Sequence, residues 1–109
     1  MDVAAALTEL SALSSEIRRA AIVDEAGALV GATAGADGER LARAAAELLA
    51  VAPAGTTYVE VGLAIGSVFA VHDGGRSAVA TTSPEPASAL VLHDLRGLLQ
   101  RTGAETDGA

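Results

Sequence analysis

Three short apolar runs in the second half of the chain, separated by turn residues, constrain its fold more than any other sequence feature. From residue 56 the apolar side chains alternate with other residues, which predicts a strand that ends near Leu63. One face of this strand would carry Val59, Val61, Leu63 and Ile65, and the other Tyr58, Glu60, Gly62 and Ala64. Two further runs, 68–72 and 77–82, flank Asp73-Gly74-Gly75. Because glycine supplies the positive φ angles of tight hairpins, the pattern predicts three consecutive antiparallel strands.

The first third of the chain predicts a helix and then a β-hairpin. Alternating spacings of four and three are typical of one helical face, and they relate Val3, Leu7, Leu10, Ser14, Ile17 and Ala21. Asp2 is the expected N-cap. Two strand-like runs, 20–23 and 28–33, then flank the turn sequence Asp24-Glu25-Ala26-Gly27. This part therefore adds one helix and two strands.

Two more helices complete the predicted order. Residues 39–52 are rich in Ala and Leu until Pro53 stops the pattern. After Pro84 and Pro86 a last helix has an apolar side made of Leu90, Val91, Leu92, Leu95, Leu98 and Leu99. The order α-β-β-α-β-β-β-α predicts an α/β (α+β) sandwich, a five-stranded antiparallel sheet flanked by helices. We expect one domain over residues 1–101 and a flexible polar tail over residues 102–109.

Composition limits the classes of function. A chain of 109 residues suits a single domain, and 14 acidic against seven basic residues give a net charge of −7, which disfavours nucleic acid as a partner. Without cysteine, a secretory leader or a long apolar segment, we expect a cytoplasmic protein with no membrane insertion. All seven basic residues are arginine, which together with abundant Ala and Gly is typical of a GC-rich bacterial genome.

No residue pattern predicts a catalytic, metal or cofactor site. His72 and His93 lack the spacing of a metal motif, and the neighbours His93 and Asp94 point in different directions on a helix. Asp24 most simply caps its own turn, and Asp73-Gly74-Gly75-Arg76 is a hairpin rather than a phosphate-binding loop. The chain also has no nucleotide-binding loop of the Gly-x-x-x-x-Gly-Lys type. We expect no enzyme activity.

The predicted order resembles that of the roadblock (dynein light chain) domain family. Three local features, which lie between residues 2 and 101, strengthen the resemblance. The hairpin 21–30 looks like the family's apolar-Asp-x-x-Gly first turn, and the segment 81–96 is similar to the family's last strand and following helix. The third feature is the Ala-rich central helix closed by Pro53.

The resemblance implies a homodimer in which the central helix and the strand after it meet their copies. An edge position for the strand at 57–63 would favour the same pairing, because its apolar run carries only one charged residue. Alanines on the central helix would let two helices approach closely. The expected interface residues are Ala44, Ala45, Leu48, Tyr58, Glu60 and Val61.

The resemblance to the family's bacterial branch also implies a small Ras-like GTPase as partner. The chain would be a non-catalytic adaptor or regulator, GTPase activation included, that docks on the switch loops. Expected contacts are Arg40, Arg43 and Glu47, although spacings of four among Glu39, Arg43 and Glu47 also suit helix-stabilising pairs. Two alternatives stay open: a small-ligand sensory domain of the profilin-like or PAS-like type, and a structural scaffold.

Overall fold

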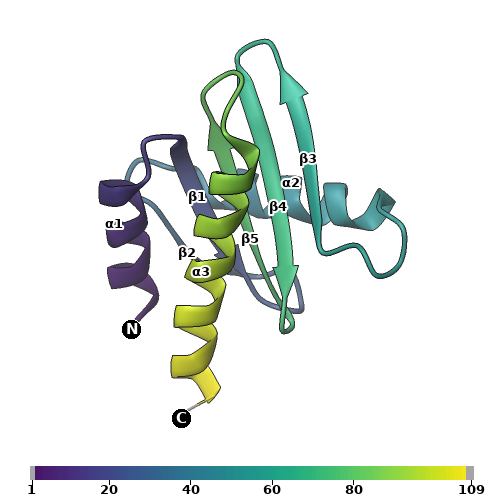
Figure 1. Ribbon diagram of the computed structural model, residues 1–109. Helices are drawn as coiled ribbons and strands as arrows, with labels where there is room; N and C mark the ends of the chain where they lie inside the picture. Colours follow the sequence, from purple (N-terminus) through teal and green to yellow (C-terminus); the bar gives the residue numbers. More distant parts are fainter. Residues whose placement is uncertain (1, 108–109) are drawn as a thin grey trace.

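The structure is a computed structural model that describes residues 2–107, with side chains described for residues 2–102. Its elements are α1 (Val3–Leu13), β1 (Ile17–Val23), β2 (Leu29–Ala32), α2 (Gly38–Val51), β3 (Tyr58–Leu63), β4 (Gly66–Asp73), β5 (Arg76–Thr82) and α3 (Ser88–Asp107). The strands form one antiparallel sheet in the order β2-β1-β5-β4-β3 (Figure 1). The predicted order and the five-stranded antiparallel sheet are confirmed.

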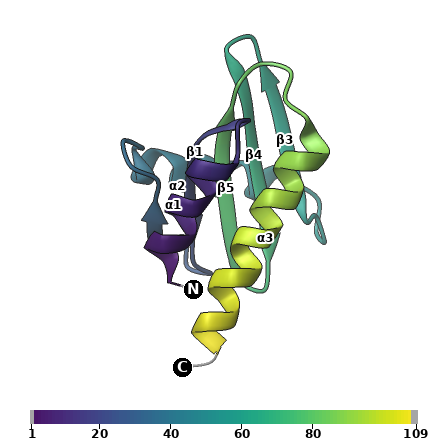
Figure 2. The same cartoon turned by 60° about the vertical axis from the view of Figure 1, so that its left-hand side comes forward.

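Helices cover both faces of the sheet. α1 and α3 lie on one face, and α2 crosses the other, as Figures 1 and 2 show from two sides. The larger core cluster lies under α1 and α3 and includes Leu10, Ile22, Phe69, Leu95 and Leu98. A smaller cluster under α2 includes Ala21, Val23, Leu41, Ala45 and Val79. Each fully buried Leu, Ile or Phe side chain stabilises the fold by about 1.5–3 kcal/mol, so the α1/α3 face contributes most of the hydrophobic stabilisation.

The boundaries of α2 and β3 agree with the predicted ones to within a residue or two. Asp37 caps α2, because its Oδ1 accepts a hydrogen bond of 3.2 Å from the N–H of Arg40. The helix ends at Val51, shortly before Pro53. β3 ends at Leu63, and its partner β4 begins at Gly66, so the two strands are joined by a two-residue turn.

The first helix is shorter than its apolar spacing predicts. It ends at Leu13, whereas Ile17, which the same spacing places on the helix, lies in β1; Ala21, which fits both the helical spacing and the predicted strand run 20–23, also lies in β1. Ser14 marks the change, because its Oγ accepts a hydrogen bond of 3.3 Å from the N–H of Ile17. Pairing of Ile17 with Thr82 and of Ala21 with Val79 then holds both residues in the sheet.

The last helix runs beyond the predicted boundary at residue 101. α3 continues to Asp107, and Thr102 is only 1% exposed. The Thr102 hydroxyl donates a hydrogen bond of 2.9 Å to the carbonyl of Leu98, one turn earlier, so a polar residue is accommodated inside the helix. Residues 108 and 109 of the predicted tail lie outside the described residues.

No helix in the described part of the chain combines the length and the apolar character that crossing a membrane requires.

Candidate interaction surfaces: the β3 edge and the α2 face

β3 lies at the end of the sheet, as expected for a strand that could pair with a second chain. The N–H of His72 donates to the carbonyl of Thr57 at 2.8 Å, which makes these opposite residues a hydrogen-bonded pair. Hydrogen-bonded and non-bonded pairs alternate along an antiparallel ladder. The N–H and C=O groups of Tyr58, Glu60 and Gly62 therefore point away from β4. Among residues 2–107 no strand pairs with this outer side.

Exposed apolar side chains gather around this edge. Among residues with described side chains, six large apolar ones are exposed, and four belong to β3 or to segments beside it in the chain. These four are Val51 at the end of α2, Tyr58 and Leu63 on β3, and Ile65 in the β3–β4 turn. Exposed apolar groups that adjoin unpaired strand backbone are typical of a protein interface.

The residues predicted for a dimer interface lie in three different environments. The side chains of Tyr58 and Glu60 face the α3 side: the Arg96 guanidinium lies 5.7 Å from the Tyr58 ring centre, and Glu60 Oε2 accepts a hydrogen bond of 2.8 Å from Ser88 Oγ. Val61, Ala44 and Leu48 are half-buried. Ala45 is 2% exposed and packs against the sheet within the chain, so its methyl group does not reach the surface.

The residues predicted to contact a partner are all on the surface of α2. Arg40, Arg43 and Glu47 are exposed. Among the residues with described side chains, Arg43 forms no ion pair within 4.0 Å with Glu39 or Glu47, although each is four positions away. The arginines of α2 are therefore accessible to a partner.

The polar residues considered as catalytic or metal-binding candidates lie in turns or on the exposed surface of a helix. Asp24 Oδ1 accepts hydrogen bonds of 2.9 Å from the N–H groups of Ala26 and Ala28, which confirms that it caps its own turn. Gly74 and Gly75 have φ angles of 61° and 85° in the β4–β5 hairpin, as predicted. His93 is exposed on α3. Within the described part of the chain, no three His, Cys, Asp or Glu residues are grouped as metal ligands would be.

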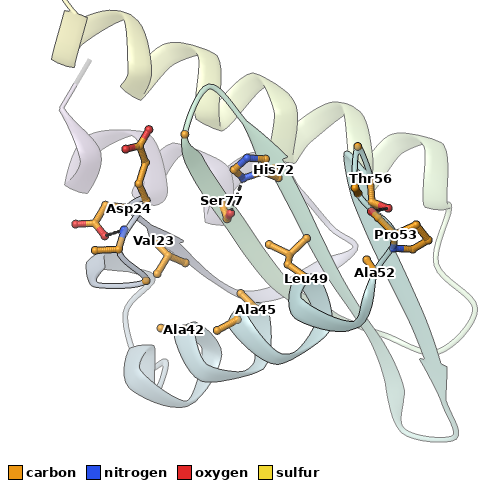
Figure 3. A pocket seen from close by; sticks show the side chains of 17 residues that line it. Val23, Asp24, Ala42, Ala45, Leu49, Ala52, Pro53, Thr56, His72 and Ser77 are labelled. Carbon is orange, nitrogen blue, oxygen red and sulfur yellow. Dashed lines mark hydrogen bonds between the residues drawn. The ribbon is translucent and has the colours of Figure 1, made fainter.

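Two hollows lie on opposite sides of α2, where the helix leaves part of the sheet uncovered. One, of about 470 Å³, lies towards the β1–β2 and β4–β5 turns, and its lining includes Ala45, Leu49, Pro53, His72 and Ser77 (Figure 3). His72 Nδ1 is 3.1 Å from Ser77 Oγ at this site. Its lining is mainly apolar, but it also includes the carboxylates of Asp24 and Glu25 and the hydroxyl of Thr56, which donates to the Pro53 carbonyl at 2.6 Å.

The second hollow, which we call the basic groove, has a volume of about 740 Å³ and lies towards the β3–β4 turn. Its lining includes Arg18 and Arg19 of β1, Asp37 and Arg40 at the start of α2, and Leu63 and Ile65. Arg18 and Arg19 were not among the site residues predicted from the sequence. The adjacent arginines in a strongly acidic chain were the available signal, but only the fold brings them to Arg40.

No protein-family model matches the chain, and no curated protein matches it by sequence. Solved structures, in contrast, match nearly its whole length. A roadblock/LC7 domain from Streptomyces avermitilis superposes with a TM-score of 0.78 at 21% identity, covering 93% of this chain and 98% of that one. Myxococcus xanthus MglB gives 0.75 at 13% identity, covering 98% and 96%.

A chain of the LokiProfilin2/rabbit actin complex is also similar, with a TM-score of 0.64 at 16% identity and coverage of 89% and 92%. The agreement in architecture with the roadblock/LC7 domain and MglB is the stronger of the two by TM-score. The chain therefore has the fold of a roadblock domain.

Proposed function

We propose that this chain is a non-catalytic adaptor or regulator that forms a homodimer through β3 and acts on a small Ras-like GTPase. The open β3 edge is the observation that carries the first half of the proposal. It combines outward backbone groups at Tyr58, Glu60 and Gly62 with exposed Leu63 and Ile65. Pairing with a second β3 would satisfy the backbone groups and cover the apolar ones.

The GTPase as partner rests on the roadblock resemblance and on the accessible arginines of α2. Arg40 and Arg43 are exposed on a helix that faces away from the main core. A guanidinium can form paired hydrogen bonds with a carboxylate, so these residues suit acidic groups on a partner. A rigid helix favours docking against switch loops over insertion of an arginine into a nucleotide site.

Affinity capture tests the GTPase half of the proposal. The tagged protein is incubated with lysate from its own source, with a GTP analogue or with GDP, and bound proteins are identified by mass spectrometry. We expect a Ras-like GTPase to be recovered mainly with the GTP analogue, and to be lost with the double variant Arg40→Glu, Arg43→Glu. Recovery of no GTPase in either nucleotide would contradict this half and leave the β3 dimer to be judged separately.

The hollow beside His72 favours the second candidate, a small-ligand sensory domain. Its volume of about 470 Å³ lies within the range of about 300–1,000 Å³ typical of small-molecule sites, and its walls are largely apolar. Ligand-observed NMR with a metabolite library distinguishes a sensory domain from an adaptor. A compound that binds the protein, and whose binding signal is absent with the variant Leu49→Arg, would support a sensory domain. An adaptor is expected to bind none.

A further inference from the structure

The basic groove holds an uneven share of the protein's charge. Three of the seven arginines line it, whereas Asp37 is the one acidic residue among residues 2–102 that does. A chain with a net charge of −7 therefore has one surface hollow with positive charge in excess.

The three guanidiniums come from two elements, β1 and α2, and form no ion pair with the described side chains. Arg18 Nη1 donates a hydrogen bond of 3.1 Å to the carbonyl of Ile65, so this side chain reaches from β1 to the β3–β4 turn. Arg19 and Arg40 are exposed. Among the residues with described side chains, no carboxylate oxygen lies within 4.0 Å of the nitrogen atoms of these arginines.

The single carboxylate of the groove already has a structural role. Asp37 is the N-cap of α2, and its Oδ1 accepts the hydrogen bond from the N–H of Arg40. Since like charges that share a hollow repel one another, an anionic group placed between the arginines would be stabilised there.

The remaining wall of the groove is apolar and exposed. Ile65 is 78% exposed and Leu63 is 54% exposed, beside the half-buried Val68. A free phosphate would satisfy the arginines but would leave these side chains in water. A nucleic acid would be repelled by the net charge of the whole protein.

We propose that the basic groove binds an acidic segment of a partner protein, one in which carboxylate side chains stand next to apolar ones. The carboxylates pair with Arg18, Arg19 and Arg40, and the apolar side chains cover Leu63 and Ile65. This does not require that the partner be a GTPase. Because the proposed β3 dimer would cover the same Leu63 and Ile65, the acidic segment and a second chain compete for these two side chains.

Fluorescence anisotropy tests the assignment with a labelled short peptide in which Glu alternates with Leu and Ser. The control peptide has Lys in place of Glu. We expect the acidic peptide to bind, the Lys peptide not to bind, and the affinity to fall as salt is added, because exposed charge pairs are screened. Failure of the acidic peptide to bind, or equal binding of the Lys peptide, would overturn the proposal.

Charge reversal locates the site. The double variant Arg19→Glu, Arg40→Glu is expected to weaken peptide binding by about tenfold or more, since two attractive contacts become repulsive. Arg43→Glu is the matched control, because Arg43 is exposed on the same helix but does not line the groove. It should change the affinity less than about twofold. An equal loss in both variants would overturn the proposal.

The same peptide and double variant test two other possible occupants of the groove, inorganic phosphate and a second copy of the chain. If inorganic phosphate displaces the peptide at equal concentration, the groove is a simple anion site and the proposal is wrong. Light scattering on the double variant tests a second copy as occupant, and an unchanged mass is expected. Dissociation of a wild-type dimer by the charge reversal would show that the groove is an interface between copies, which would also overturn the proposal.

Discussion

The two ends of the sheet differ in almost every property that governs strand pairing. β2, at one end, has only four residues, all half-buried, and lies between α1 and α2. Gly31 lies so close to Val3 and Leu7 of α1 that there is no room for a side chain. β3, at the other end, has six residues, outward backbone groups and exposed apolar neighbours. β2 is short and packed between helices on both faces, whereas β3 is longer and is flanked by exposed apolar side chains.

This difference bears on how the protein can assemble. A sheet with two open edges can extend without limit, whereas a sheet with one open edge can pair only once. Because β2 is short and packed between two helices, whereas β3 is longer and flanked by exposed apolar side chains, pairing through β3 is favoured, which gives a closed pair of chains rather than a fibre.

Proline at neighbouring positions of β3 is expected to have the largest effect. The N–H of Val61 faces β4, so Val61→Pro removes a hydrogen bond within the chain and should lower the free energy of unfolding by about 2 kcal/mol or more. The N–H of Gly62 faces outward, so Gly62→Pro should abolish self-association with little loss of stability. Urea unfolding of the dilute protein measures the free energy of unfolding, and light scattering measures self-association. Equal destabilisation by both prolines would contradict the assigned ladder.

The same substitution at the glycine of each edge strand tests the packing of β2 against α1. A Cβ at Gly31 would lie 2.7 Å from Val3 Cγ1 and 3.2 Å from Leu7 Cδ1, so Gly31→Val should cost about 2 kcal/mol of unfolding free energy. A Cβ at Gly62 would have Ser67 Oγ, 4.0 Å away, as its nearest neighbour. Gly62→Val should therefore change the free energy of unfolding by less than about 0.5 kcal/mol. Urea denaturation gives both values. Similar costs would mean that β2 is not held against α1.

The exposed apolar side chains offer a smaller, surface-only test. Ile65 and Leu13 are both 78% exposed, but only Ile65 adjoins β3. We expect Ile65→Ser to raise the dissociation constant of the dimer about tenfold, because apolar area buried by pairing is lost. Leu13→Ser, at the end of α1, should leave it unchanged. Sedimentation velocity over a dilution series measures both, and an effect of Leu13→Ser alone would move the interface to α1.

The smallest effect is expected at Glu60, the only charged residue of β3. Symmetric antiparallel pairing of two β3 strands brings the two Glu60 side chains close together, and like charges across strands destabilise a pair. Glu60→Gln should therefore tighten the dimer about two- to fivefold, while an amide oxygen can still accept from Ser88. Weaker association of this variant would contradict pairing centred on β3.

Local signals made much of this fold predictable from the sequence. Pro53 correctly marked the end of α2, and the period-two pattern from residue 56 correctly predicted a strand that ends at Leu63. The start of β1 was predicted too late, because Ile17 continues the helical spacing by coincidence and only pairing with β5 places it in a strand. Local pattern contains no information on such long-range pairing.

The surfaces were less predictable than the elements. Edge pairing by β3 could be proposed because its apolar run has a single charge, but its place at the end of the sheet depends on the strand order. Arg18 and Arg19 are far from Arg40 in the sequence and meet it only across β1 and α2. Ala45, which the sequence predicts at an interface, packs α2 on the sheet within the chain.

Amide hydrogen exchange at the β3 edge tests the central claim most directly. NMR would follow the N–H groups of Tyr58, Glu60 and Gly62 over a concentration series, with the N–H of Val61, bonded to β4, as the internal reference. We predict that the three outward amides are protected at high concentration and exchange rapidly on dilution, while Val61 stays protected throughout. Rapid exchange of the outward amides at every concentration would contradict pairing through β3.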